Sequence, residues 1–388
     1  MSNALQNLKA RNASLANPMT ALFELTFICN HACSFCYNCP TGQKEMNTGE
    51  VIDALRKLAE FNILYLTLSG GEPLVRKDFF AIAQAARELG FALRIYTNGY
   101  LIDEAMAQRI KAVANPVEVE ISIHGARPET HDKLTCVPGS LNKILDAVRF
   151  LRRQGIKVIL KCPVTRDNQE EVLGLERLAR ELGALIIFDT VITPRDNGDR
   201  EPVDLSATDD FLRRFWRDEA YASARKQPVP LPRKDGPGEA VCGTGRTSLA
   251  IDPYGNIYPC VQLRRKVANI KDLAHLRDMW RSSPVLIEVR KTAVEVAQTV
   301  LKQAKNGDQQ CGFCMGVADL QMGDPTALYP QMSRNAEFRA QAYDAWKAKK
   351  EDVRAAAPGC SPGAAGDSAA GCVTSSDAPG KERSGSAT

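Results

Sequence analysis

The stretch Cys29-Asn30-His31-Ala32-Cys33-Ser34-Phe35-Cys36 directly follows the short apolar run Leu22–Ile28. Its three cysteines are separated by three and by two residues. A short loop with this spacing can direct each thiolate to a different iron of a four-iron cluster, and it leaves the fourth iron without a protein ligand. Such an iron can bind a small molecule and pass an electron into it. The loop therefore predicts a reactive iron-sulfur site at the end of a strand.

A structural zinc site is the alternative for these thiols, but zinc favours four ligands in two close pairs, and this loop offers a triplet. Cys39 would close the site if it served as a fourth ligand. The Cys-x3-Cys-x2-Cys spacing, with the aromatic Phe35 just before the last cysteine, resembles the signature of the radical S-adenosylmethionine (radical SAM) enzymes. This resemblance implies a 4Fe-4S cluster on Cys29, Cys33 and Cys36, with SAM bound beside Phe35.

The composition is that of an ordinary globular protein. Of 388 residues, 44% are hydrophobic and 25% are charged, and the net charge is only +4. The densest basic cluster, Arg264-Arg265-Lys266, is expected to be a solvated turn, so we expect no nucleic-acid partner. The segment Met1–Pro18 is polar and no stretch reaches the roughly 18 apolar residues of a membrane span. We therefore expect a cytoplasmic protein, in which the 12 cysteines favour metal binding over disulfides.

A second motif follows the next predicted strand, Ile63–Leu68, which ends at Ser69-Gly70-Gly71-Glu72-Pro73. Two glycines at the end of a parallel strand let the backbone approach a ligand closely, and the glutamate supplies a carboxylate for a cationic amine. In the radical SAM family the matching motif holds the methionyl amino group of SAM. The resemblance implies that role for Gly70, Gly71 and Glu72, with Ser69 and Pro73 as neighbours in the same binding loop.

Strands and helices alternate strictly through the first half of the chain. The strand patterns are followed by helical patterns of period 3.6, with Asp103 placed to cap one of the helices. Expected strands are 22–28, 63–68, 92–96, 117–123, 158–162 and 185–188, and expected helices are 49–61, 78–89, 103–113, 140–154 and 169–182. This order implies a parallel α/β sheet, open or wrapped. The family resemblance makes it a partial, six-stranded (β/α) barrel of the TIM type.

Ligands gather at the carboxyl ends of parallel strands. Residues at or just beyond those ends are candidates to hydrogen-bond the ribose and carboxylate of SAM: Ser69, Asn98, Ser122 and Asn168. His31 and His124 are interpreted as loop residues, although His124 could touch a ligand. Cys136 could relay a hydrogen atom or be an incidental loop thiol. Cys162 is expected in the core.

The second half of the chain contains another set of cysteines. A hairpin is predicted from 247–251 and 256–258 around Asp252-Pro253-Tyr254-Gly255, with Cys242 before it and Cys260 after it. Cys311 and Cys314 complete four thiolates, enough for zinc or an iron-sulfur cluster. The pattern resembles the SPASM/Twitch extension of radical SAM enzymes, truncated after Cys314. This resemblance implies one auxiliary 4Fe-4S cluster bound by Cys242, Cys260, Cys311 and Cys314.

The expected domains follow these patterns. They are an N-terminal segment (1–19), the barrel (20–192), a linker with one helix (193–240), the auxiliary cluster domain (241–330), a C-terminal helix (331–354) and a disordered tail (355–388) that holds Cys360 and Cys372.

The resemblance implies an enzyme that reductively cleaves SAM to a 5′-deoxyadenosyl radical, which abstracts a hydrogen atom from the substrate. It also implies an electron donor such as flavodoxin or ferredoxin. The leading hypothesis for the substrate is a peptide or protein, as in the maturation of ribosomally made precursors. About twenty residues precede the barrel, too few for a precursor-binding domain, which leaves room for a separate recognition protein. A tetrapyrrole or other small metabolite is the second hypothesis, and a non-catalytic iron-sulfur or metal carrier is the third.

Overall fold

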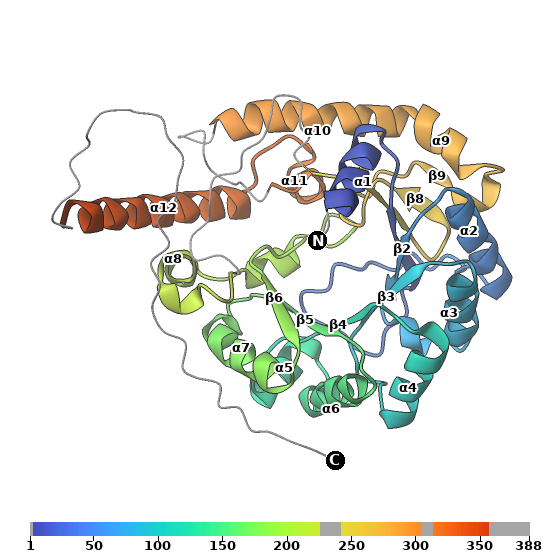
Figure 1. Cartoon of the computed structure of the whole chain (residues 1–388), viewed down its shortest axis with the longest axis horizontal. Coiled ribbons are helices and arrows are strands. Elements are labelled where there is room, and N and C mark those ends of the chain that lie inside the picture. The colour runs from blue at the N-terminus through green and yellow to red at the C-terminus, as the bar shows by residue number, and fades with distance from the viewer. Residues whose placement is uncertain (1–2, 226–241, 304–312, 357–388) are drawn as a thin grey trace, which may run out of the picture. The chain divides into compact units, whose positions relative to one another are not determined.

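A single sheet organises the first of two compact units, Met1–Trp346 and Lys347–Thr388. This computed structural model describes residues 3–225, 242–303 and 313–356. The strand order is β6-β5-β4-β3-β2-β1-β7-β8-β9. The first six strands are parallel and in sequence order: β1 (Thr20–Thr26), β2 (Tyr65–Gly70), β3 (Ala92–Thr97), β4 (Glu118–Ser122), β5 (Val158–Pro163) and β6 (Leu185–Asp189). The predicted α/β alternation is confirmed, and the sheet curves without closing, as in a partial barrel (Figure 1).

Helices cover the outer face of this curved sheet (Figure 1). The predicted helices that lie between the strands are confirmed as α2 (Thr48–Glu60), α3 (Phe79–Glu88), α4 (Glu104–Arg109), α6 (Ser140–Arg153) and α7 (Val172–Glu181). Asn47 and Glu50 form a capping box at the start of α2. Asp103 caps α4 as predicted, because its carboxylate accepts a hydrogen bond from the Met106 amide at 2.7 Å.

Side chains alternate across each strand, and the two faces of β4 show the consequence. Val119 and Ile121 are fully buried in the core between the sheet and the helices. Glu118, Glu120 and Ser122 have the opposite parity and are only partly buried. The apolar face of the strand therefore holds the fold together, whereas its polar face lines the inside of the barrel.

The predicted hairpin extends the barrel sheet. Its strands are β7 (Ser248–Ile251) and β8 (Asn256–Tyr258), and β9 (Ala268–Asn269) pairs with β8. Strand β7 runs parallel to β1, with Ile251 opposite Phe23. The sequence predicted the hairpin but gave no sign of this pairing, because the two strands are more than 200 residues apart. The pairing fixes the region after Cys242 directly against the first strand of the barrel.

The described part of the chain contains further helices besides the predicted helices between the barrel strands. They are α1 (Asn3–Ser14), α5 (Pro128–Thr135), α8 (Asp209–Arg217), α9 (Leu276–Ser282), α10 (Pro284–Gln303), α11 (Met315–Met322) and α12 (Pro330–Ala356). Short turns of helix are η1 (Pro73–Val75), η2 (Ile110–Ala114, a π-helix), η3 (Gln169–Glu171), η4 (Glu201–Leu205), η5 (Glu219–Tyr221) and η6 (Ile270–Asp272). Helices α1, α5 and α11 were not predicted. Most of the predicted tail, 357–388, lies outside the described residues.

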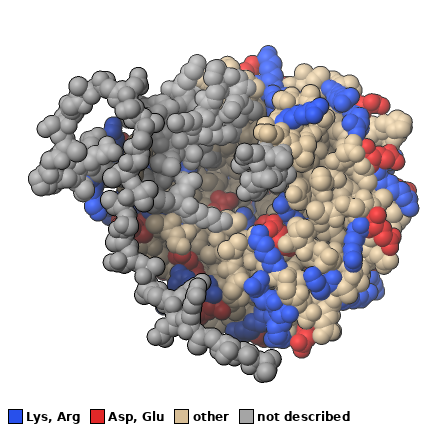
Figure 2. All heavy atoms as spheres, viewed as in Figure 1, with Lys and Arg blue, Asp and Glu red and all other residues tan. Residues whose placement is uncertain are grey.

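Trp280 of α9 shows how the later helices attach to the barrel. Its ring is fully buried, and its indole N–H donates to the Ala16 carbonyl at 2.8 Å. It shares one continuous core with Phe61 and the barrel strands. None of the described helices is both long and apolar enough to span a bilayer. On the face shown in Figure 2, basic and acidic side chains are interspersed.

Candidate functional site

The carboxyl ends of β1 to β6 surround a hollow of about 330 Å³. The three cysteines of the cluster loop, Cys29 to Cys36, line it together, and all three are free thiols. The predicted cofactor residues that also line it are Phe35, Ser69, Gly70, Gly71, Asn98 and Ser122. The structure therefore brings the cysteine triplet and the glycine turn, 34 residues apart in sequence, to one site.

The cluster loop is held by its backbone. The amides of Ala32 and Ser34 donate to the carbonyls of Thr135 and Leu134, at 3.2 and 3.1 Å, at the end of α5. At the other end of the loop, the Arg195 guanidinium donates to the Cys36 carbonyl at 3.2 Å. These backbone contacts hold the loop so that its three thiols line the hollow, where the Cys29 sulfur also accepts a hydrogen bond from the His31 amide at 3.4 Å.

Helix α5 is itself fixed by a buried carboxylate. Glu171 accepts hydrogen bonds from the amides of Ala126 and Arg127, from the Arg127 guanidinium and from the Thr130 hydroxyl, at distances of 2.5 to 3.2 Å. Burial alone would raise the pKa of Glu171, but these donors outweigh it and lower the pKa. The ionised carboxylate of Glu171 thus supports the helix on which the cluster loop rests.

The three thiols are of the donor type that binds an iron-sulfur cluster, and they line one hollow. Burial, together with the neighbouring charges of Cys36 and Cys29, raises the pKa of Cys33 to about 12. Three such thiols stay protonated by themselves, and cationic iron is the partner that would stabilise them as thiolates. In the part of the chain that the structure describes, no group of three or more His, Cys, Asp or Glu side chains is placed to hold a single metal ion.

The glycine turn is pressed against the end of β1. A Cβ atom on Gly70 would lie 2.2 Å from the Thr26 carbonyl oxygen, and one on Gly71 would lie 2.6 Å from the Ile28 carbonyl oxygen. Gly70 also has a φ of +138°, which L-residues rarely adopt. Only glycine fits at these two positions, so the turn and the cluster loop can form adjacent walls of the hollow.

The Glu72 carboxylate, predicted to face a ligand amine, does not line the hollow in this structure. This side chain is fully buried and accepts hydrogen bonds from the Leu74 amide, the Thr97 hydroxyl and the Asn98 amide, at 3.0, 2.8 and 2.7 Å. Burial raises its pKa to about 7, against the effect of these donors. Glu72 thus ties the glycine turn to the end of β3, and Pro73 is buried beside it at the start of η1.

Asn98 and Asn168 were both predicted to contact SAM, and the structure separates them. The Asn98 amide donates to the Asn30 side chain at 2.7 Å and reaches the Cys29 sulfur at 3.8 Å, at the edge of the hollow. Asn168 is fully buried and donates to the carbonyls of His124 and Pro163 at 3.1 and 3.0 Å. Asn168 therefore joins two strand ends and has no face toward the hollow.

Two histidines interpreted as loop residues line the hollow, His31 and His124. His124 is 4% exposed, packs edge-on against Phe35 with 4.7 Å between ring centroids, and leaves its Nδ1 without a partner in the described residues. His131 stacks on it and accepts the His124 amide through Nδ1 at 3.0 Å. Burial lowers the pKa of His124 well below its ordinary value and that of His131 to about 4, so both rings are neutral.

Cys136 is placed outside the hollow, contrary to the prediction that it faces the barrel mouth. It follows the last residue of α5 in a left-handed conformation, with φ of +58°, and its side chain is exposed. Its thiol does not line the hollow, although it lies near enough to Cys33 for its charge to act on that thiol. Cys162 is buried as predicted, and it also forms part of the hollow wall.

The wall opposite the cluster loop carries charged groups that sequence reasoning missed: Tyr96, Glu120, Lys161 and Asp189. They come from β3, β4, β5 and β6, and Lys161 lies opposite Ser122 in the strand register. The charges of Glu120 and Asp189 act on Lys161 through space, without a direct ion pair in the described residues. The only signal for these residues in the sequence was that polar residues alternate with apolar ones inside the predicted strands.

One layer deeper in the barrel, the charges are paired. Glu118 accepts from Arg94 at 2.9 Å and from Lys157 at 2.7 Å. Glu120, in contrast, is hydrogen-bonded to the neutral Tyr96 hydroxyl and makes no ion pair with Lys161 in the described part of the chain, so the charge of each can meet a polar ligand.

The second group of cysteines is only partly described. Cys242, Cys260 and Cys314 are half-buried, whereas Cys311 lies outside the described residues. Burial, together with the charges of Cys260 and Cys242, raises the pKa of Cys314 to about 12. Three neighbouring thiols fit an iron-sulfur cluster in donor type.

Two family models match the chain. The model of the radical SAM superfamily matches residues 23–179, and that of the SPASM iron-sulfur cluster-binding domain matches residues 242–315. The first match contains the cluster loop and the glycine turn. The second contains the four later cysteines and ends just after Cys314.

Individual proteins resemble the chain over most of its length. An AdoMet-dependent heme synthase from Methanosarcina barkeri is 26% identical over 70% of this chain and 85% of its own length. A PqqA peptide cyclase from Xanthomonas axonopodis pv. citri is 26% identical over 84% of this chain and 91% of its own length. The crystal structure of native anSMEcpe with bound AdoMet superposes with a TM-score of 0.60 at 17% identity, covering 87% and 100% of the two chains. This structure shares the fold.

Gly70→Ala tests the close approach of the glycine turn to β1. We expect the clash with Thr26 to force the turn outward, so the variant loses both stability and measurable SAM binding. Gly139→Ala is the matched control, because Gly139 has φ of +76° but open space at its Cβ position. The control should cost only about 1–2 kcal/mol and bind SAM normally. Thermal denaturation and SAM titration of the reconstituted protein measure both effects, and equal SAM affinities would contradict the assignment.

Glu171→Gln tests the support of α5. Replacing a carboxylate that accepts several hydrogen bonds should lower the free energy of unfolding by about 2 kcal/mol at neutral pH. Because the folded-state pKa is lowered, this stabilisation is present above the unfolded pKa of about 4.3 and is lost as the pH falls toward the folded pKa. The gap between wild type and variant in urea unfolding should therefore shrink in acid. Glu170→Gln, which removes an exposed pair with Arg214, should change stability by less than about 1 kcal/mol. A gap that is constant with pH would contradict this account.

Proposed function

Since the chain belongs to the radical SAM superfamily and carries a SPASM-type iron-sulfur domain, we propose that it is a peptide-modifying member of that superfamily. It is an enzyme that uses a 4Fe-4S cluster, an auxiliary cluster domain and SAM. In the proposal, the substrate is a peptide or protein, and the reaction begins with removal of a hydrogen atom from one of its carbons.

The observation that carries the choice of substrate is the extent of the similarity to a peptide cyclase. That match runs over 367 residues and 84% of this chain, across both family regions. The match to the heme synthase runs over 298 residues and 70% of the chain. The longer match supports a peptide substrate, although the two identities are equal at 26%.

In this proposal Cys29, Cys33 and Cys36 would hold the cluster that binds SAM. Once reduced by an external electron donor, a cluster held there would pass one electron to bound SAM and cleave it to methionine and a 5′-deoxyadenosyl radical. The backbone of Gly70 and Gly71 would receive the methionyl amine, since no side chain intervenes there. Asn98 and Ser122 offer hydrogen bonds for the carboxylate and ribose, and Phe35 offers an aromatic ring.

The charged wall is where a substrate side chain would meet the protein. Lys161 can donate to a carbonyl or carboxylate, and Glu120 and Asp189 can accept from amides or cations. A peptide offers all of these groups. The half-buried position of the wall makes each contact stronger than it would be in open water.

A small carboxylated metabolite is the second candidate, favoured by the similarity to a heme synthase and by the ammonium group of Lys161. Both candidates use the same SAM site. They differ in what the wall of Lys161, Glu120 and Asp189 must recognise.

Iron content tests the cofactor part of the proposal. Wild-type protein reconstituted without oxygen should hold about eight irons per chain, for two four-iron clusters. Cys33→Ala should retain about four, because only the auxiliary cluster remains. Cys136→Ala is the matched control and should keep all eight, since its thiol lies outside the hollow. A wild-type count near four would contradict the second cluster.

The activity test uses SAM and dithionite under anaerobic conditions. We expect 5′-deoxyadenosine from wild type and Cys136→Ala, and none above background from Cys33→Ala. Its absence from wild type would favour a non-catalytic carrier.

The substrate test co-expresses the enzyme with short reading frames that neighbour its gene. A peptide modified by oxidation should lose two hydrogen masses, and the change should disappear with Cys33→Ala. Unchanged peptides, together with consumption of an added carboxylated tetrapyrrole, would contradict the peptide proposal.

A further inference from the structure

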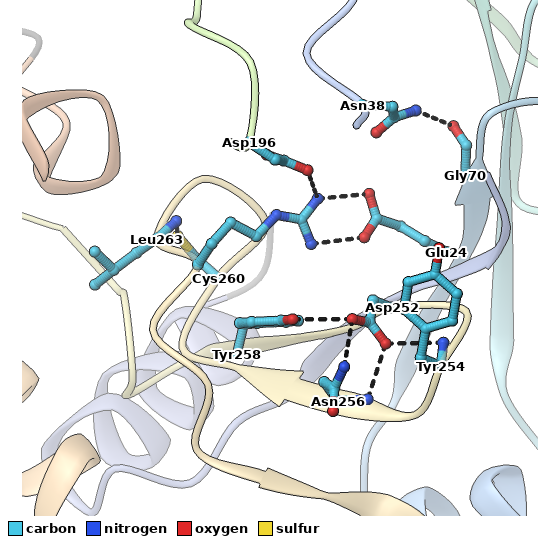
Figure 3. A network of polar contacts seen from close by, with 11 residues as sticks. Glu24, Asn38, Gly70, Asp196, Asp252, Tyr254, Asn256, Tyr258, Cys260 and Leu263 are labelled. Carbon is cyan, nitrogen blue, oxygen red and sulfur yellow. Dashed lines mark hydrogen bonds and ion pairs between the residues drawn. The ribbon is translucent and has the colours of Figure 1, made fainter. Parts of the chain in front are cut away.

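A buried arginine joins the barrel to the auxiliary domain, which corrects the prediction that Arg264 lies in a solvated turn. Its guanidinium donates to both carboxylate oxygens of Glu24 on β1, at 2.7 and 2.9 Å. It also pairs with Asp196 at 3.0 Å (Figure 3). Glu24 is fully buried, and Arg264 and Asp196 are 11% and 15% exposed. We call these three residues the charge latch.

The charge latch lies between the two groups of cysteines. On the barrel side, the Asp196 amide donates to the Tyr37 carbonyl at 2.8 Å, one residue after Cys36. On the auxiliary side, the Leu263 amide, next to Arg264, donates to the Cys260 sulfur at 3.3 Å (Figure 3). The latch is thus the ionic contact that connects the Cys36 end of the cluster loop with the loop after Cys260.

The charges of the latch do not balance. Two carboxylates face one guanidinium, and burial raises the pKa of both Glu24 and Asp196. The neighbouring Asp252 is a further carboxylate, and the groups that donate hydrogen bonds to it are neutral, so they bring no balancing positive charge. These donors are the amides of Tyr254 and Asn256, the Asn256 side chain and the Tyr258 hydroxyl, all at 2.8 to 2.9 Å (Figure 3). Three charged groups act on the Cys36 sulfur: Arg195, whose positive charge has the largest effect, and the negatively charged Asp196 and Glu24.

We propose that Arg264 is a positioning residue that holds Glu24 and Asp196 beside Cys36, and that their negative charges, acting against the positive charge of Arg195, lower the reduction potential of the cluster on that loop. The inference relies on the cluster proposed for Cys29, Cys33 and Cys36, and it is independent of the substrate. Reduction adds one electron to the cluster, so a nearby negative charge opposes it and a nearby positive charge favours it.

The sign of each substitution follows from this electrostatic argument. Asp196→Asn and Glu24→Gln remove a negative charge while keeping shape, so each should raise the midpoint potential. Arg264→Gln removes the cation that keeps the two buried carboxylates ionised, so they should take up a proton in its place and the midpoint potential should rise as well. A unit charge at this depth should change the equilibrium constant for reduction by roughly tenfold, which is about 59 mV for one electron.

The chain offers a matched control one residue away. Arg265 pairs with Asp319 at 2.9 Å within the auxiliary domain, and neither residue touches the cluster loop. Asp319→Asn removes the same charge from the same type of pair. It should leave the potential of the first cluster unchanged.

The experiment is a redox titration of full-length, reconstituted protein, followed by the electron paramagnetic resonance signal of the reduced first cluster. Cys242→Ala can be added to every variant to remove the signal of the auxiliary cluster. We expect upward shifts for all three latch variants, Asp196→Asn, Glu24→Gln and Arg264→Gln, and none for Asp319→Asn.

Downward shifts for Asp196→Asn and Glu24→Gln, or shifts no larger than that of Asp319→Asn, would overturn the inference, because loss of a negative charge beside the cluster can only raise its potential. If Arg264→Gln fails to fold, Asp196→Asn decides alone, since it leaves the bidentate Arg264–Glu24 pair in place. Absence of any cluster signal in wild type would instead defeat the proposed function, so the two failures can be told apart.

Discussion

The fit of the glycine turn against the end of β1 is the constraint on which the site depends. With 2.2 Å between a Cβ on Gly70 and the Thr26 carbonyl, no other residue allows the turn to lie there. The turn stays in place because the buried Glu72 carboxylate ties it to Thr97 and Asn98. These contacts set the cluster loop and the glycine backbone side by side, which is the geometry that a ligand of a loop-bound cluster requires.

Support for the cluster loop comes from backbone contacts and buried charges, so its thiols are left free for chemistry. Glu171 fixes α5, and α5 carbonyls hold Ala32 and Ser34. On the other side, Arg264 joins β1 to the loop after Cys260. The parallel pairing of β7 with β1 adds a continuous sheet between the two cysteine groups. The barrel and the auxiliary region are therefore built as one folding unit, with a shared core that includes Trp280.

Sequence reasoning was strong where local pattern decides structure. The spacing of the three cysteines, the glycine turn and the alternation of strand and helix patterns can all be recognised in the sequence. Together they predicted the parallel sheet and the strand ends that surround the hollow. It failed for side-chain direction and for distant partners. The position of Glu72 after a strand does not say which way its carboxylate turns. Lys161 lies in a run that reads as a buried strand, and Arg264 has its main partner 240 residues away. Helix α5 is short and polar, so its sequence resembled a loop.

The most direct test of the account is whether the cluster on Cys29, Cys33 and Cys36 has an iron open to SAM. The measurement is the electron paramagnetic resonance spectrum of reduced, reconstituted wild-type protein before and after SAM is added. The account predicts that SAM changes the g-values or line shape of this cluster. An identical spectrum at saturating SAM would contradict it.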